Sequence, residues 1–147
     1  SYTPYQPELS QGYLQTIYEF QTMIAEIFGM DLANASMYDG STALAEAALM
    51  AVGVKGKDRV VASAAIHPHH LEVLRTYCWG VDVEVVMAPV EDGRTVWPTG
   101  VDASACLVPS PNFYGLIEDL AAARAACDGL LLVSADPVAC ALMRSPG

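Results

Sequence analysis

From residue 59 onward, short apolar runs alternate with stretches of helical periodicity, and this alternation constrains the fold more than any other feature. We expect strands at residues 59–63, 81–87, 105–108 and 130–134, and helices at residues 69–79 and 116–127. The strand at 130–134 is continuously apolar, which is typical of a sheet covered on both faces. Alternating strands and helices form βαβ units with right-handed crossovers. The sequence therefore predicts an α/β fold, with a mostly parallel sheet and helices on both faces.

Two helical segments precede these strands. Apolar residues recur at helical spacing over residues 11–28, with Ser10 at the N-cap position and Gly29 as the stop. Residues 41–52 form an alanine-rich second helix that can approach a sheet closely. We expect residues 1–30 to be an N-terminal arm and long helix, and residues 31–147 to be an α/β domain. The length of 147 residues fits a single domain overall.

The composition excludes some classes of partner. With seven basic residues and a net charge of −10, the chain lacks the basic stripe that nucleic-acid binding requires. It also lacks an apolar run long enough for a membrane span. The apolar fraction of 53% is high for a soluble chain. Two explanations stay open: a dense α/β core, or apolar surface that a partner covers. We expect the chain not to behave as a simple monomer, because a shortened sheet leaves an unpaired edge.

The four cysteines, which are widely spaced, lie in apolar contexts without a C-x-x-C pair. This pattern favours buried, reduced thiols over disulfides or metal ligands. No signal peptide is visible, although the chain does not begin with Met and targeting stays open.

Polar residues follow several of the expected strands, and ligands of parallel sheets bind at the carboxyl ends of strands. Gly40, Ser41 and Thr42 open a helix, where free N–H groups and the helix dipole can hold an anion. The alternative is ordinary N-capping. Asp136 ends the last strand and could pair with a pyridinium nitrogen, or simply form a turn with Pro137.

His67 follows a strand and is spaced i, i+3 from His70. His67 could stack on a cofactor ring in a pocket, or the pair could share a metal ion. A third metal ligand is not evident, and simple capping or surface roles are the remaining alternative. We therefore expect no metal.

The positions of the lysines decide whether the chain could form a covalent aldimine, because that chemistry needs an amine beside the aldehyde of a bound ligand. The only lysines, Lys55 and Lys57, lie in a polar turn between a helix and a strand. That turn is at the wrong end of the strand for a site at its carboxyl edge. We expect no lysine of this chain to form a covalent aldimine at that edge.

The opening segment, residues 1–12, carries two tyrosines and two prolines. Pro4 and Pro7 favour extended geometry at the residues before them, so we expect an extended, stiff segment that displays Tyr2 and Tyr5. A phenol suits a small polar-substrate pocket. The alternative is that both rings pack under the first helix.

This opening segment is one of seven pieces that together resemble a known family. The pieces lie, in order, at residues 1–12, 18–24, 33–40, 67–68, 111–115, 117–119 and 146–147. In this order they resemble the N-terminal half, or alpha subunit, of the glycine cleavage system P-protein, a pyridoxal-phosphate-dependent glycine decarboxylase. The resemblance covers nearly the whole chain. Residues 95–105 and 127–132 look shorter than is usual in the family, and both ends of the alpha subunit are missing.

The resemblance implies a function for the chain and for its site residues. The fold would be the first part of the large domain of fold-type I, aspartate-aminotransferase-like enzymes. The partner, a beta-type half, would bind pyridoxal phosphate, and this chain would hold no complete pyridoxal-phosphate site. Tyr2 and Tyr5 would line the active site. The remnants of an ancestral cofactor site would be Gly40, Ser41, Thr42, His67 and Asp136.

The chain alone would be inactive. In a heterotetramer, the assembly would decarboxylate glycine and pass the aminomethyl group to a lipoylated H-protein. Its location would be cytoplasmic, or the mitochondrial matrix in a eukaryote. The alternatives from other classes are a non-catalytic α/β anion-binding module and a small metal hydrolase using His67 and His70.

Overall fold

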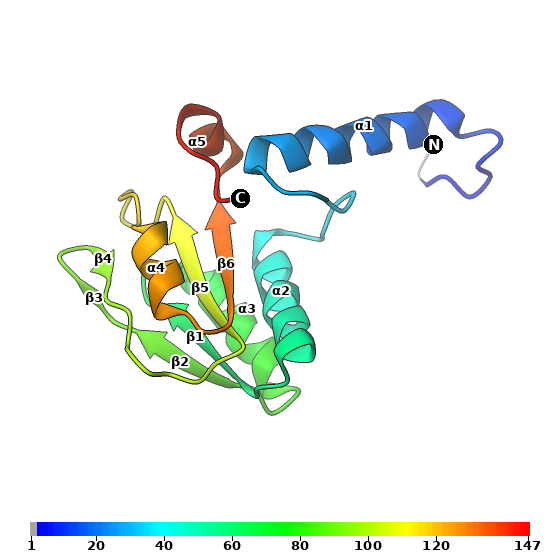
Figure 1. Cartoon of the computed structure of the whole chain (residues 1–147). Coiled ribbons are helices and arrows are strands. Elements are labelled where there is room, and N and C mark those ends of the chain that lie inside the picture. Colours follow the sequence, from blue (N-terminus) through cyan, green and yellow to red (C-terminus); the bar gives the residue numbers. More distant parts are fainter. Residues whose placement is uncertain (1–2) are drawn as a thin grey trace. The chain divides into compact units, whose positions relative to one another are not determined.

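The computed structural model describes residues 3–147 (Figure 1). The chain divides into two compact units, residues 38–136 and residues 1–37 with 137–147, and each is described here by itself. The expected division into residues 1–30 and 31–147 stays a prediction, since compactness alone does not define an independently folding domain.

The unit of residues 38–136 is built on a four-stranded sheet with the order β2-β1-β5-β6. All the strand pairs in this sheet are parallel. The strands are β1 (Arg59–Ser63), β2 (Glu84–Ala88), β5 (Ala105–Ser110) and β6 (Leu130–Ala135). Strands β2 and β6 are the two edges of the sheet in the part of the chain that the structure describes.

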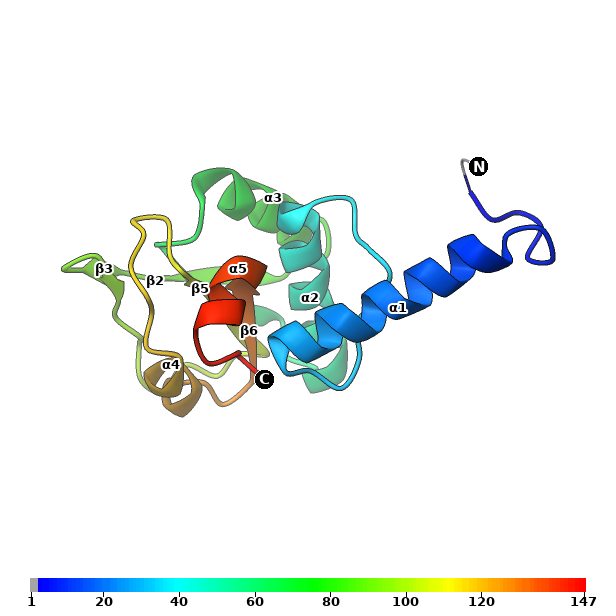
Figure 2. The same cartoon turned by 90° about the horizontal axis from the view of Figure 1, so that it is seen from above.

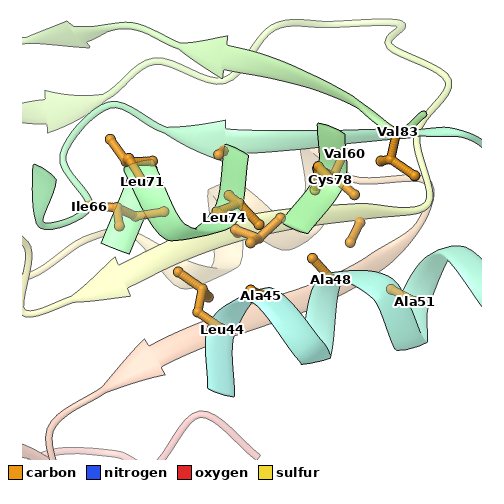
Figure 3. Close-up of a cluster of buried hydrophobic side chains, with 13 residues drawn as sticks. Leu44, Ala45, Ala48, Ala51, Val60, Ile66, Leu71, Leu74, Cys78 and Val83 are labelled. Carbon is orange, nitrogen blue, oxygen red and sulfur yellow. The ribbon is translucent and has the colours of Figure 1, made fainter. Parts of the chain in front are cut away.

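Helices cover both faces of this sheet. The helices α2 (Gly40–Lys55) and α3 (Pro68–Trp79) pack on one face, with Val60 and Leu107 of the sheet in the same buried cluster (Figure 3). The other face carries Val61 and Cys106, which pack beside α4 (Leu120–Ala126). Figure 2 shows α3 and α4 on opposite sides of the strands. Because neighbouring strand residues point to opposite faces, Val60 and Val61 serve different clusters. The expected fold class is confirmed.

Small residues explain how closely α2 approaches its neighbours. Ala45, Ala48 and Ala51 are fully buried on one side of the helix and face α3 and the sheet (Figure 3). The most deeply buried large side chains of this cluster are Ile66, Leu74 and Leu107. Burying such a side chain stabilises the fold by about 1.5–3 kcal/mol.

Several expected boundaries were wrong. The second strand begins at Glu84 rather than at residue 81, because Asp82 has a φ of 57° and lies in a turn. The third strand runs through Pro109 to Ser110. Proline has no N–H to donate to a neighbouring strand. It is tolerated at position 109 because the pairing between β5 and β1 ends at Leu107, so no paired β1 residue lies opposite Pro109. The expected helix at 116–127 is shorter, Leu120–Ala126.

A small hairpin follows β2. The strands β3 (Val90–Glu91) and β4 (Arg94–Thr95) pair antiparallel across a two-residue turn. Both turn residues have positive φ, 49° at Asp92 and 77° at Gly93, as a type I′ turn requires. Asp92 and Gly93 therefore form the tip of a hairpin.

The other unit contains α1 (Gln11–Phe28) and α5 (Pro137–Leu142), which contact each other. The bounds of α1 were predicted correctly, and Gly29 ends the helix with a φ of 66°. Ser10 stands at the N-cap but makes no capping bond with its side chain. None of the residues of α1, all of which the structure describes, is buried.

The opening segment differs from the expected extended strand. Residues 5–9 form bends and a turn, in which the N–H groups of Leu9 and Ser10 donate to the Gln6 carbonyl. Pro7 explains the turn, because proline at its second position fixes the required φ. The expectation of an extended segment was therefore wrong here.

Candidate functional site

The N-terminus of α2, where the sequence allows either an anion site or ordinary N-capping, is already occupied by a carboxylate of the chain. Asp39 Oδ1 accepts hydrogen bonds from the Thr42 N–H at 2.7 Å and from the Ser41 and Thr42 hydroxyls, each at 2.8 Å. Thr42 Oγ1 accepts in return from the Asp39 N–H at 3.1 Å, which completes a capping box. The bond from the Thr42 N–H is the largest of the effects that lower the pKa of Asp39 from 3.8 to about 2.

This arrangement has a chemical consequence for residues 40–42. At neutral pH the Asp39 carboxylate is ionised and uses the donors that an exogenous phosphate would need. It also places a negative charge where the phosphate would bind. The geometry therefore favours the capping alternative over an anion site at this helix start.

His67 caps the next helix and lies among other aromatic rings. Its Nδ1 accepts from the His69 N–H at 3.2 Å, so one ring nitrogen is engaged with the backbone. The His67 ring lies 5.1 Å from the Phe113 ring in an edge-on arrangement and 5.2 Å from the His70 ring. Partial burial of His70 is the largest cause that lowers its pKa, and the nearby His67 lowers it further. His67 itself is exposed, as a side chain that lines an open edge would be.

His70 connects His67 to the start of α2. A Cβ atom added to Gly40 would lie 3.5 Å from Cε1 of His70. The predicted residues Gly40 and His67 are thus brought to one place, although they are far apart in the sequence. Across residues 3–147 no group of three or more histidine, cysteine or acidic side chains could hold a metal ion.

The loop after β5 carries a network of hydrogen-bonded polar side chains near the carboxyl ends of the strands. Glu118 and Asn112 are buried, with 5% and 6% of their surface exposed. The Glu118 carboxylate accepts from Asn112 Nδ2 at 2.8 Å and from Thr95 Oγ1 at 2.9 Å. Thr95 Oγ1 lies 2.6 Å from Ser63 Oγ, at the end of β1. The network therefore ties the hairpin, β1 and the loop after β5 together.

Asn112 also fixes the turn that follows it. Its Oδ1 accepts from the N–H groups of Tyr114 and Leu116, at 3.0 and 3.1 Å. The N–H of Phe113 donates to the Ala65 carbonyl at 2.9 Å. Phe113 and Tyr114 nevertheless keep 53% and 59% of their surface exposed. A buried polar network thus holds two aromatic side chains at the surface beside His67.

Sequence reasoning did not assign roles to Asn112, Phe113, Tyr114 and Glu118. All four lie in the pieces Pro-Asn-Phe-Tyr-Gly and Ile-Glu-Asp, which were used only for the family resemblance. The signal that could have found them is chemical: an acid and an amide at an exposed-looking turn, close to the carboxyl end of an apolar strand.

Three predicted residues remain: Asp136, Tyr5 and Tyr2. Asp136 directly follows β6, and Ala135 pairs with Ser110, so Asp136 lies at the same sheet edge as the loop after β5. Tyr5 belongs to the unit with α1, and 85% of its surface is exposed. It therefore does not pack under the first helix. Tyr2 lies outside the described residues.

The lysines lie at the opposite end of the sheet, where the strands begin. Lys55 ends α2, and Lys57 lies just before β1, where its backbone N–H donates to Ser104 Oγ at 3.1 Å, close to the start of β5. Lys57 forms an ion pair with Asp102, which raises the pKa of the lysine. Both lysines are thus remote from the carboxyl ends of the strands, where His67 and Phe113 lie.

The unit with α1 has an open groove of its own. Tyr18, Gln21, Thr22, Ala25 and Glu26 of α1 line it together with residues 30–33. Gln21 Nε2 donates to the Ala33 carbonyl at 2.6 Å and closes one side. No candidate side chain from the sequence lies in this groove.

The fold and the site together define a class: an α/β domain with a parallel sheet, whose candidate functional residues gather at the carboxyl ends of the strands. Comparison with known proteins gives the family within that class. A family model described as "Glycine cleavage system P-protein" matches residues 1–147. The chain belongs to the glycine cleavage system P-protein family.

Individual relatives agree with this assignment. The chain is 51% identical to the probable glycine dehydrogenase (decarboxylating) subunit 1 of Thermomicrobium roseum and 46% identical to that of Brevibacillus brevis. It matches a crystal structure of glycine decarboxylase (P-protein), determined in inhibitor-bound form, with a TM-score of 0.93 at 46% identity. All of this chain is covered in each case, but only 35% of each of these proteins. The chain thus spans about a third of their length, and the family resemblance seen in the sequence is confirmed.

Proposed function

We propose that this chain is a portion of subunit 1 of a glycine dehydrogenase (decarboxylating). The observation that carries the proposal is the match to proteins of that name along the whole chain, at 51% identity in one case. As part of that enzyme the chain acts on glycine together with a second, lysine-bearing P-protein half. Its own role is to assemble with that half and to shape the active site, and it is inactive by itself.

The enzyme's cofactor in this proposal is pyridoxal phosphate, which supplies the electron sink for decarboxylation when bound. The residues of this chain do not fit it. The helix start at residues 40–42 is capped by the Asp39 carboxylate, and both lysines lie at the other edge of the sheet. This supports assignment of the cofactor to the partner half. Gly40, Ser41, Thr42, His67 and Asp136 are then remnants of an ancestral cofactor site.

The chain contributes surface and shape rather than bond-making groups. His67 and Phe113 form an aromatic edge held by the Glu118 network. In the assembled enzyme Tyr5 and Tyr2 line the pocket, and Tyr5 has the exposure that such a role needs. We further propose that the product's aminomethyl group passes to a lipoylated H-protein and that the enzyme is a heterotetramer.

The proposed location is cytoplasmic, or the mitochondrial matrix in a eukaryote. Free thiols at Cys78, Cys106 and Cys127, all buried, suit a reducing compartment. Among the helices of residues 3–147, none is both long and apolar enough to cross a membrane.

The test is to assay the full protein alone, its lysine-bearing partner alone and the two together. We expect release of CO2 from carboxyl-labelled glycine only from the combination. We also expect no absorbance band at about 400–430 nm in the full protein alone, and no borohydride labelling at Lys55 or Lys57. CO2 release by this protein alone, or a labelled lysine, would contradict the proposal. Metal analysis of the purified protein separates the hydrolase alternative.

A substitution at Tyr5 tests the proposed pocket role. Tyr5→Phe removes only a hydroxyl, and because 85% of the residue surface is exposed, we expect the melting temperature to change little. A pocket role predicts a loss of glycine turnover of about tenfold or more in the assembled enzyme. Tyr13→Phe, on α1, is the matched control. Unchanged turnover in the Tyr5 variant would remove Tyr5 from the site, and the same test applies to Tyr2.

A further inference from the structure

The turn that follows β5 exposes four large side chains within five residues. They are Phe113, Tyr114, Leu116 and Ile117, with between 37% and 59% of their surface exposed, and we call them the 113–117 patch. Residues 103–117 contain no charged side chain, although the chain as a whole has a net charge of −10. The centre of a protein–protein interface is likewise poor in charge and rich in aromatic residues. The composition of the patch therefore suits the centre of such a contact.

The backbone under this patch is held in one conformation. Each of the five N–H groups of residues 112–116 donates to an acceptor of the protein. The Asn112 N–H donates to the Leu116 carbonyl at 2.8 Å, and the Gly115 N–H donates to the Asn112 carbonyl at 2.9 Å. Water could satisfy such groups at the surface of a loop. The turn is thus ordered to a degree that solvation alone does not require.

A buried chain of hydrogen bonds supports the turn from below. Thr95 Oγ1 donates its only proton to the Glu118 carboxylate, so in its 2.6 Å contact with Ser63 Oγ the serine hydroxyl donates. Ser63 Oγ accepts in turn from the Ala65 N–H at 3.0 Å. The same carboxylate accepts from Asn112. A buried network in which each polar group has its partner makes a structure rigid.

Asn112 connects this network to the turn and to the hairpin. Its Nδ2 donates to the Gly93 carbonyl at 2.8 Å as well as to Glu118. Leu116 packs closely on the same glycine, since a Cβ atom added to Gly93 would lie 2.7 Å from Cδ1 of Leu116. One amide side chain thus fixes both the shape of the turn and its position against the hairpin tip.

The form of the patch favours a macromolecular partner over a small ligand. A small ligand needs a concave site that buries most of its surface, whereas Phe113 and Tyr114 stand on a turn with more than half of their surface exposed. Aromatic rings on a rigid turn lose little conformational entropy when a partner covers them. The patch also lies where the parallel strands end, beside the ring of His67. Ligands of parallel sheets bind at that end.

We propose that the 113–117 patch is a contact surface for the lysine-bearing P-protein half, and that Asn112 is the residue that positions it. This inference rests on the proposed function, in which that half supplies the lysine and meets this chain at the active site. The Phe113 and Tyr114 rings insert into the partner's surface. Asn112 and Glu118 touch neither partner nor substrate, and they act by holding the two rings in place.

The experiment measures the dissociation constant between the full protein and its lysine-bearing half, together with glycine turnover of the mixture. Phe113→Ala and Tyr114→Ala are each expected to weaken binding about tenfold or more, as truncation of an aromatic interface anchor does. Their melting temperatures should stay close to that of the wild type, because more than half of each side chain is already exposed. Turnover should fall at low concentrations of the half and recover when the half is in excess.

Matched controls separate docking from general destabilisation. Trp79→Ala removes an exposed aromatic ring at the end of α3, shortly before β2 begins and so at the other end of the sheet, and is expected to leave binding unchanged. Asn112→Ala should weaken binding as well as stability. Ser104→Ala also removes a buried polar group, one bonded to Lys57 at the opposite end of the strands, and should lower stability alone.

The outcomes distinguish this inference from the proposed function. If the wild-type protein binds the half and turns over glycine, but Phe113→Ala and Tyr114→Ala bind equally well, the contact surface is wrong and the function stands. Loss of turnover without loss of binding would also overturn the inference, because the rings would then serve the chemistry. If the wild-type pair neither binds nor releases CO2, the proposed function fails and this inference fails with it.

Discussion

At the residue scale, the Asp39 carboxylate is the best example of a side chain whose role the local sequence only partly indicated. For Gly40, Ser41 and Thr42 the sequence leaves open an anion site or ordinary N-capping, and the chain supplies its own anion one residue earlier. The carboxylate is exposed, so it stabilises the start of α2 through hydrogen bonds to the first turn of the helix and not through burial. This changes what substitution and pH should do.

The first prediction concerns acid. Because folding lowers the pKa of Asp39 to about 2, its contribution to stability is complete above about pH 4 and is lost as the pH falls toward 2. We expect Asp39→Ala to lower the melting temperature at pH 7, and this loss to shrink at pH 2. Glu46→Gln, on the exposed part of the same helix, is the control. An equal loss at both values of pH would contradict this role.

The second prediction concerns the buried Glu118. Glu118→Gln replaces an acceptor oxygen with a donor amide that faces the Asn112 amide and the Thr95 hydroxyl. Unsatisfied buried groups of this kind cost about 1–3 kcal/mol, so we expect the free energy of unfolding to fall by that amount. Urea titration measures it, with Glu72→Gln on the exposed side of α3 as control. Equal stability of the two variants would show that the network contributes little.

At the scale of elements, α4 is shorter than its sequence periodicity indicated. Residues 116–119 have helix-compatible composition, yet Glu118 turns inward to Asn112 and Thr95. Asp119 then begins the helix as its N-cap and accepts from the Ala122 N–H at 2.9 Å. A tertiary hydrogen bond thus competes with helix propensity, and it wins because the carboxylate would otherwise be buried without partners.

The third prediction follows from this cap. Asp119→Ala is expected to destabilise α4 by about 1 kcal/mol, because one N–H of its first turn loses its partner. Hydrogen exchange should become faster at residues 120–126, while α2 and α3 keep their protection. Asp58→Ala, an exposed aspartate outside any helix, serves as control. Faster exchange throughout the sheet would instead mean that α4 opens only with global unfolding.

At the scale of the whole molecule, each of the two units exposes apolar side chains. Six large side chains of α1 are substantially exposed: Tyr13, Leu14, Tyr18, Phe20, Met23 and Ile27. In the sheet unit, β6 is an edge strand, and its six residues are only half-buried. Both features agree with a chain that spans 35% of its relatives. The association expected from composition stays a prediction.

The fourth prediction tests this association. Sedimentation of the 147-residue chain is expected to show self-association or aggregation, because parallel edge strands and apolar helix faces lack cover. Two changes on one face of α1, Phe20→Glu with Met23→Glu, should reduce it, whereas Glu19→Gln should not. A compact monomer with cooperative unfolding would contradict the expectation.

The sequence by itself determined the α/β class, the bounds of α1 and β1, and the presence of an alanine-rich second helix. These features depend on local periodicity and on glycine and proline stops, which neighbouring residues encode. The family resemblance also implied that Gly40 and His67 belong to one site, and His70 brings the two residues together in the structure.

Only the tertiary structure decided the polar details. Glu118, Thr95 and Ser63 come from three separate segments, so their hydrogen bonds cannot be read from spacing along the chain. The same holds for the buried cluster that contains both Cys106 and Cys127. Local sequence fixes which elements form because their signals act over a few residues. The packing of those elements fixes which side chains meet, because that depends on contacts between distant segments.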